Sequence, residues 1–113
     1  MKIFNPSTEE VIREIPEDSS ESVKQKFLLL KDGQKEWWQT PITERIKCIR
    51  NFSYSLEKHN QELAKILTSE MGKPLWQSHN ELKGAQYRIK FFLENSEKYL
   101  SEEWVNVADS TLS

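Results

Sequence analysis

The sequence contains few of the glycines from which phosphate-binding loops are built. Its three glycines, Gly33, Gly72 and Gly84, are widely separated. A dinucleotide fingerprint and a P-loop both need clustered glycines, because the backbone must approach the phosphates closely. The chain therefore carries neither motif, and we expect no cofactor bound to it through such a loop.

Cysteine and histidine are also too scarce for most metal and thiol chemistry. Cys48 is the single cysteine, so an intramolecular disulfide is excluded. It lies in mid-helix beside Ile46 and Ile49, and we predict a small, partly buried apolar side chain rather than a nucleophile. His59 and His79 lie 20 residues apart without a cysteine pair, which leaves no ligand set for tetrahedral zinc.

The remaining short catalytic patterns are incomplete. His79 and Glu81 match the first half of the zinc deaminase pattern, but the Pro-Cys-x-x-Cys half is absent. Ser55 and Lys58 match Ser-x-x-Lys, but the companion elements of that acyl-transfer site are missing. We therefore predict no catalytic, cofactor-binding or metal-binding residue in this chain.

The sequence has no block of like charge and no long apolar run. Lys plus Arg is 16 and Asp plus Glu is 18, for a net charge of −2, which disfavours nucleic acids and anionic membranes as partners. The longest apolar run, Phe27–Leu30, is far short of the roughly 20 residues that span a bilayer. Met1–Pro6 has no signal-peptide character, so a cytoplasmic location is expected.

Aromatic residues are abundant, although the chain is polar as a whole. Four Trp, five Phe and three Tyr argue against disorder. A hydrophobic fraction of 36% is nevertheless lean for an independent core. The pair Trp37–Trp38 is interpreted as one core anchor and one exposed neighbour, with an aromatic ligand platform as the alternative. Residues 1–113 are predicted to form a single partial domain.

Alternation at the start of the chain predicts a short β-hairpin over residues 2–16. Asn5–Thr8 supplies the turn, and the residues from Val11 to Ile15 alternate in the second strand. An isolated two-stranded hairpin is marginally stable in water. This hairpin therefore needs another surface on which to lie.

Apolar spacing of three and four predicts about four amphipathic helices in the region 20–100. An extended tail over 101–113 follows them. The fold class is therefore mainly α, with a short N-terminal β-hairpin. The expected helices cover residues 20–38, 41–58, 60–72 and 75–100.

Capping residues set the expected ends of these helices. Asp18 with Glu21 resembles a reciprocal cap at the first helix. Thr40 is expected to cap the second helix and Asn60 the third. Gly72 is expected to close the third helix.

Three short segments occur in an order and at spacings that resemble one enzyme superfamily. Asn5–Glu10 looks like an Asn-Pro-Ala/Ser-Thr-Gly-Glu opening, with Glu9 in place of the usual glycine. Trp37–Arg45 resembles Trp-x-x-Thr-Pro-x-x-x-Glu-Arg, with one residue fewer between Pro41 and Glu44. Thr68–Pro74 is similar to Thr-x-Glu-x-Gly-Lys-Pro, and Glu81 follows at the expected distance. All three are features of the aldehyde dehydrogenase superfamily.

The end of the chain looks most like the succinate-semialdehyde dehydrogenase branch, through Phe91-Phe92 and Tyr99–Glu103. The resemblance implies a longer parent enzyme that oxidises an aldehyde to a carboxylic acid with NAD or NADP. The family's nucleophilic cysteine, base glutamate and cofactor-contacting residues have no matching positions here. Residues 1–113 would then be the outer part of an α/β cofactor domain, whose role is to pack against the dinucleotide-binding sheet.

Two functional hypotheses follow. In the first, the chain is an N-terminal fragment of such a dehydrogenase, inactive alone, whose partner is the remainder of that chain or a second copy in a homo-oligomer. In the alternative, it is an independent helical protein-interaction module derived from that family. A module should carry polar replacements on the faces that once met the sheet. Those faces remain apolar in this sequence, which favours the fragment.

Overall fold

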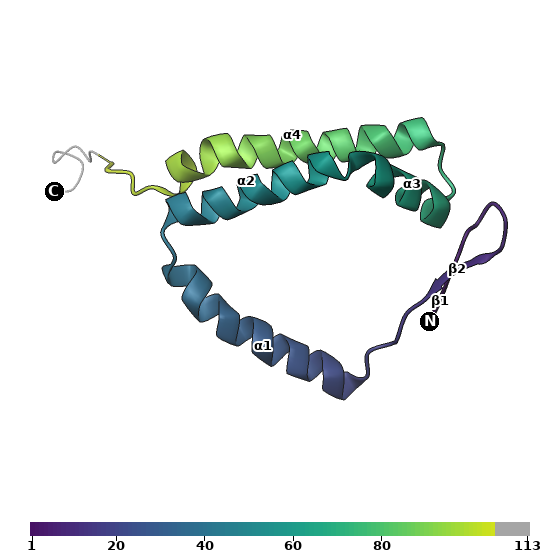
Figure 1. Cartoon of the computed structure of the whole chain (residues 1–113). Coiled ribbons are helices and arrows are strands. Elements are labelled where there is room, and N and C mark those ends of the chain that lie inside the picture. The colour runs from purple at the N-terminus through teal and green to yellow at the C-terminus, as the bar shows by residue number, and fades with distance from the viewer. Residues whose placement is uncertain (106–113) are drawn as a thin grey trace, which may run out of the picture.

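The computed structural model describes residues 1–105 and is mainly helical, with a short hairpin at its start (Figure 1). Residues 101–105 belong to no helix or strand, and residues 106–113 of the predicted tail lie outside the described residues. Both the predicted hairpin and the four predicted helices are present. The elements are β1 (Lys2–Phe4), β2 (Val11–Glu14), α1 (Ser20–Gln39), α2 (Ile42–Lys58), α3 (Asn60–Met71) and α4 (Leu75–Leu100).

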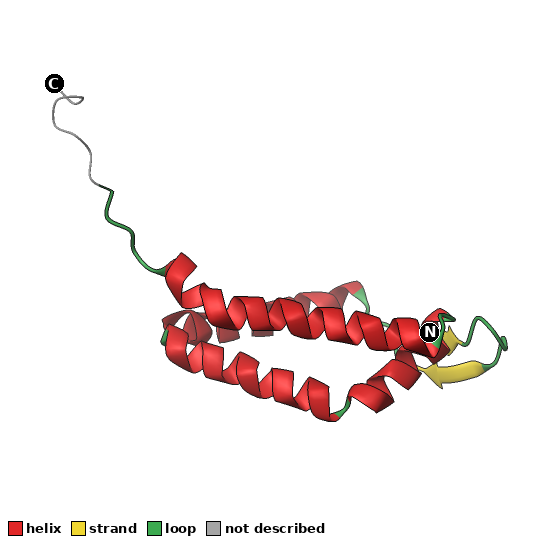
Figure 2. Cartoon of the chain, turned by 90° about the horizontal axis from the view of Figure 1, so that it is seen from above, coloured by secondary structure: helices red, strands yellow, loops and turns green. Residues whose placement is uncertain are grey.

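The long helix α4 runs alongside α2 and α3 (Figures 1 and 2). At the crossing of α3 and α4, Ala64 and Ser78 are completely buried. The hydroxyl oxygens of Thr68 and Ser78 lie 2.7 Å apart across this contact. Such small side chains allow two helix backbones to approach closely, so this crossing is the best packed part of residues 1–105.

Helix α1 lies apart from the other helices and joins them only near its C-terminal end (Figure 1). Its predicted inward face is exposed: Val23, Phe27 and Leu30 are 55%, 60% and 74% accessible. Trp37 lines a small cavity with α2 and α4 but is 39% exposed, so the prediction of a core anchor is wrong; Trp38 is 74% exposed, as expected. The radius of gyration is 21.2 Å, against about 13 Å for a compact domain of 100 residues. No element within residues 1–105 covers the apolar face of α1.

The predicted cap of α1 is displaced by one residue. Ser19, not Asp18, is the N-cap: its hydroxyl accepts from the Ser22 backbone N–H at 3.1 Å, and its own N–H donates to the Ser22 hydroxyl at 2.8 Å. Asp18 instead accepts hydrogen bonds from Lys26 and from the Ser22 hydroxyl, which lower the pKa of its carboxyl. The Ser22 hydroxyl supplies the second half of the reciprocal cap, a role that the sequence analysis assigns to Glu21.

The predicted caps of α2 and α3 are wrong, although both helices begin where expected. Thr40 ends α1, and its hydroxyl donates to the Glu36 carbonyl at 3.0 Å. Pro41 is the N-cap of α2, and a residue before proline is restricted to extended backbone, which stops α1 at Thr40. Asn60 is the first residue of α3, and its side-chain oxygen pairs with His79 at 3.1 Å.

The hairpin turn has one strained residue. The Asn5 side-chain oxygen accepts from the backbone N–H groups of Ser7 and Thr8, at 2.9 and 3.3 Å. Glu9 follows with a φ of 63°, in the left-handed region. An L-residue with a Cβ pays about 1–2 kcal/mol for this conformation. The structure therefore explains why the resembling family usually has glycine at this position.

Gly72 ends α3 and contacts the hairpin turn. Its φ is 70°, and its N–H donates to the Thr68 carbonyl at 2.9 Å. A Cβ added at Gly72 would lie 2.7 Å from Cγ of Pro6. Glycine is thus required twice, by the left-handed backbone and by the close approach of the Asn-Pro turn. This contact seats the hairpin against the α3–α4 turn.

We predict that Gly72→Ala destabilises the protein, by about 1–2 kcal/mol from the left-handed backbone alone and by a further amount from the clash with Pro6. Gly84→Ala is the matched control, because a Cβ there meets nothing within 4 Å. The control should raise stability by up to about 1 kcal/mol, since Gly84 is inside α4. Thermal denaturation followed by circular dichroism measures both changes.

A double-mutant cycle with Pro6→Ala isolates the clash. Pro6→Ala should recover part of the loss caused by Gly72→Ala, because it removes the Cγ that the new methyl group meets. Strictly additive effects of the two substitutions would contradict the contact between the hairpin and Gly72.

Candidate functional site

The turn between α3 and α4 carries the most family-specific residues of the sequence. Lys73 follows the left-handed Gly72 and forms an ion pair with Glu81, one turn and a half into α4. Pro74 is the N-cap of α4 and cannot continue α3. These residues reverse the chain and fix the direction of α4. Their geometry assigns them a structural role, and none of them faces a pocket with a base or nucleophile.

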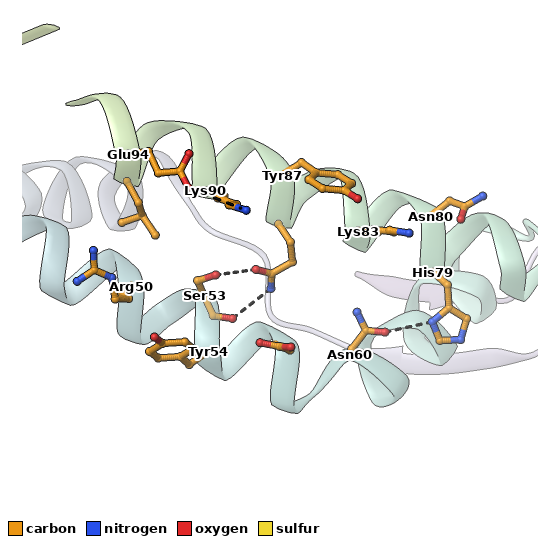
Figure 3. A pocket seen from close by; sticks show the side chains of 13 residues that line it. Arg50, Ser53, Tyr54, Asn60, His79, Asn80, Lys83, Tyr87, Lys90 and Glu94 are labelled. Carbon is orange, nitrogen blue, oxygen red and sulfur yellow. Dashed lines mark hydrogen bonds and ion pairs between the residues drawn. The ribbon is translucent and has the colours of Figure 1, made fainter. Parts of the chain in front are cut away.

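A groove of about 730 Å³ lies between α2 and α4 (Figure 3). All of its lining residues except Leu93 carry a polar group. The sequence did not predict this groove, because it forms only when two helices, with contacting residues 33 positions apart in the chain, lie side by side. The lining residues are Arg50, Ser53, Tyr54, Glu57, Asn60, His79, Asn80, Lys83, Gln86, Tyr87, Lys90, Leu93 and Glu94.

Two hydrogen-bonded pairs hold the groove together (Figure 3). The Ser53 hydroxyl donates to the side-chain oxygen of Gln86 at 2.6 Å, and the Gln86 amide donates to the Ser53 carbonyl at 3.1 Å. At the other end, the His79 ring contacts Asn60. These contacts join α2 and α3 to α4, so the two predicted surface or helix-end histidines differ: His79 is half-buried and structural, and His59 is exposed at the end of α2.

The charges in this groove do not form a catalytic arrangement. Lys90 and Glu94 lie 4.0 Å apart as an exposed pair on one helix. Ser53, which carries the only hydroxyl of the groove besides the tyrosines, donates to Gln86 and forms no hydrogen bond with a base within the described residues. Nucleophilic catalysis needs a nucleophile within hydrogen-bond reach of a general base. The groove therefore offers polar contacts but no reactive pair.

The motif residues considered in the sequence lie on the surface. Cys48 is exposed, so the predicted partial burial is wrong. A helix turns about 100° per residue, which places Cys48 beside the stripe of Ile46 and Ile49 rather than in it. Ser55 and Lys58 are both exposed on α2, and the Ser55 carbonyl accepts from the ring of His59 at 2.8 Å.

The residues present do not fit a dinucleotide cofactor. Pyrophosphate binds where a glycine-rich turn leads into a helix N-terminus. Gly33 and Gly84 lie inside helices, and Gly72 lies at the C-terminal end of α3, where the helix dipole repels anions. In residues 1–105 no group of three or more His, Cys, Asp or Glu could hold a metal ion. None of the helices described here combines the length and the hydrophobicity that a bilayer crossing requires.

The whole sequence matches a known family, and similar proteins are found in bacteria and archaea. The model of the aldehyde dehydrogenase family matches residues 1–113. A malonate-semialdehyde dehydrogenase of Oceanobacillus iheyensis is 26% identical over 94% of this chain and 22% of its own length. A probable aldehyde dehydrogenase of Pseudomonas is 36% identical over 75% of this chain and 17% of its own length.

A further relative and a solved structure agree with this match. A probable succinate-semialdehyde dehydrogenase [NADP(+)] of Sinorhizobium fredii is 27% identical over 88% of the chain and 20% of its own length. The crystal structure of the glyceraldehyde-3-phosphate dehydrogenase GapN of Methanocaldococcus jannaschii, complexed with NADP, superposes with a TM-score of 0.87 at 28% identity. The superposed part covers 96% of this chain and 24% of the GapN chain.

The chain spans about a fifth of the length of the curated relatives that it matches. The match nevertheless runs from the hairpin to the last helix, in agreement with the resemblance of the Asn-Pro turn and the Gly-Lys-Pro turn. The chain belongs to the aldehyde dehydrogenase family.

Proposed function

We propose that residues 1–113 form the N-terminal part of the cofactor domain of an NAD(P)-dependent aldehyde dehydrogenase. The complete enzyme oxidises an aldehyde to a carboxylic acid, and succinate semialdehyde is the candidate substrate. This part contributes no catalytic or cofactor-binding residue. Its role is to form the hairpin and the outer helices that support the dinucleotide-binding sheet.

One observation carries this proposal. The chain is open and holds almost no core, yet its elements superpose on a solved dehydrogenase with a TM-score of 0.87. A stand-alone domain would be expected to close its helices over one another, because apolar burial is the main term that stabilises a fold. The open arrangement matches one quarter of a larger enzyme, as we expect for a part that supports the rest of that enzyme.

The exposed apolar side chains give this role an energetic basis. Full burial of one large side chain contributes about 1.5–3 kcal/mol. Phe27, Leu30 and Phe92 are each at least 60% exposed. Covering several such residues rivals the 5–15 kcal/mol net stability of a typical domain. We therefore expect the remainder of the dehydrogenase to supply most of the stability of this segment.

The names of the similar proteins support a semialdehyde substrate and a nicotinamide cofactor. Two of them are named malonate-semialdehyde and succinate-semialdehyde dehydrogenases. The solved relative is complexed with NADP, and the Sinorhizobium relative is named for NADP(+). We therefore propose NAD or NADP as the cofactor of the complete enzyme.

The alternative, an independent helical interaction module, has less support. Such a module should have replaced the apolar residues that once met the sheet. On α1, Val23, Phe27 and Leu30 form an apolar face, and all three side chains are exposed. Retained apolar faces favour a segment that docks on the rest of a dehydrogenase.

We predict that the isolated chain neither reduces NADP with aldehydes nor binds it, whereas a chimaera does both. Calorimetric titration of the chain with NAD and NADP should show no binding tighter than about 100 μM, or about −5.5 kcal/mol. The chimaera carries residues 1–113 in place of the matching quarter of the M. jannaschii enzyme. It should bind NADP and reduce it with glyceraldehyde-3-phosphate.

The control is a second chimaera with the matching segment of the O. iheyensis relative, which is a member of the same family. If the control is active and the chimaera with residues 1–113 is not, the proposed function is wrong. Tight cofactor binding by the isolated chain would equally contradict it.

We also predict that the isolated chain self-associates. Trp76, Phe91 and Phe92 are 63%, 50% and 60% exposed and form our candidate contact surface on α4. Large exposed apolar patches are rare on soluble monomers and tend to be covered by a partner, and a second copy is the nearest partner available. Light scattering coupled to size exclusion should show a mass that rises with concentration.

Replacing the three residues with glutamine should shift the chain toward the monomer. Tyr87→Gln is the matched control, because Tyr87 is equally exposed on α4 but lies in the polar groove. A monomer at all concentrations, with a cooperative melt, would contradict self-association and favour the independent module.

A further inference from the structure

The groove between α2 and α4 has the volume of a small-molecule binding site. It measures about 730 Å³, within the roughly 300–1,000 Å³ that such sites occupy in proteins. Its two walls are helix surfaces, and the two hydrogen bonds between Ser53 and Gln86 hold these walls together. The side chains along the groove therefore have fixed relative positions, from which the chemistry of a ligand can be inferred.

The two walls run in opposite directions, and two contacts set their register. Ser53 on α2 contacts Gln86 on α4, and Asn60, at the start of α3, contacts His79. Seven residues forward from Ser53 to Asn60 thus correspond to seven residues back from Gln86 to His79. Counting from either contact therefore gives the level on α4 that lies across from a given residue of α2.

This register gives the two ends of the groove different charges (Figure 3). Arg50 lies level with residue 89, next to Lys90, so two cations occupy opposite walls at one end. Glu57 lies level with residue 82, next to Lys83, so the charges of the other end balance. At the first end the carboxylate of Glu94 lies 4.0 Å from Lys90. One positive charge remains in excess there.

The charge of Arg50 is not neutralised within residues 1–105. The ion pairs in this part of the chain do not include Arg50. Lys90 has only a long, exposed contact with Glu94, and such pairs are weak. The chain as a whole has a net charge of −2, so its overall field does not attract anions. An anion would bind here through the local cations alone.

Two tyrosines add apolar surface between the two ends of the groove. Tyr54 comes from α2 and Tyr87 from α4, one from each wall (Figure 3). Each of them is 62% exposed, so most of both side chains is free to contact a ligand. Aromatic rings pair with other rings by offset stacking or edge to face. The walls therefore offer a flat apolar group a place beside the two cations.

We propose that this groove binds a small aromatic anion, with its carboxylate or phosphate group between Arg50 and Lys90 and its ring against Tyr54 and Tyr87. A guanidinium group donates to two oxygens of a carboxylate or phosphate at once, and a lysine ammonium adds a point charge. Four side chains from two helices thus act on one ligand. A solvated charged helix face would lack both the opposite wall and the rings.

The first test is a titration of the isotope-labelled chain, followed by the NMR shifts of its backbone amides. The probes are phenyl phosphate, benzoate, inorganic phosphate and phenol. Phenyl phosphate or benzoate should shift the amides of residues 50–54 and 87–90 in a saturable manner. It should bind at least about threefold tighter than inorganic phosphate, which has no ring, or phenol, which is neutral. The tighter of the two aromatic anions identifies the preferred anionic group.

Four substitutions of exposed residues locate the anionic group within the groove. Arg50→Gln should weaken binding of the preferred probe about threefold or more. Lys83→Gln is the matched control, because it removes the same charge about 10 Å along α4 from Lys90, and it should change the affinity less than about twofold. Glu94→Gln should tighten binding, because its carboxylate competes for Lys90, whereas its matched control Glu57→Gln should not.

Three outcomes would overturn the inference. Equal weakening by Arg50→Gln and Lys83→Gln would show a diffuse attraction rather than a site. Inorganic phosphate that binds as tightly as phenyl phosphate would show that the tyrosine rings take no part. The absence of any saturable shift with either aromatic anion up to about 10 mM would show that the groove is merely a solvated helix surface. Circular dichroism of each variant confirms that the helices are unchanged.

Discussion

Burial of apolar surface is the constraint on which the structure of this chain depends, and residues 1–105 achieve very little of it. Only Ala64 and Ser78 are fully buried, at the crossing of α3 and α4. In most proteins helices are stabilised by the packing of an apolar face rather than by their intrinsic propensity. Helix α1 has an apolar face, but no surface within residues 1–105 packs against that face. Within residues 1–105 the apolar face of α1 therefore stays uncovered.

The turn around Gly72 explains two family motifs as one structural unit. The Asn-Pro turn of the hairpin packs on Gly72, where a side chain would collide with Pro6. The next residue, Lys73, pairs with Glu81 and fixes α4 in direction. These residues identify the family through geometry and not through chemistry. Through its contact with Pro6, this turn places the hairpin at one end of the helical layer.

Helix positions could be predicted from sequence, since apolar spacing reports which side of each helix must be covered. The caps at Asp18, Thr40 and Asn60 could not, because neighbouring serines and a proline compete for the same backbone groups. The groove between α2 and α4 depends on contacts between residues that are distant in the chain, which no local pattern encodes.

Hydrogen–deuterium exchange of the isolated chain measures the central claim most directly, because it reports the opening free energy of each segment. The account predicts strong protection only around Ala64 and Ser78, where α3 and α4 cross. Amides of α1 should exchange nearly as fast as those of an unstructured chain. Uniform, strong protection from α1 to α4 in a monomer would contradict the account, because it would show a domain that is stable without a partner surface.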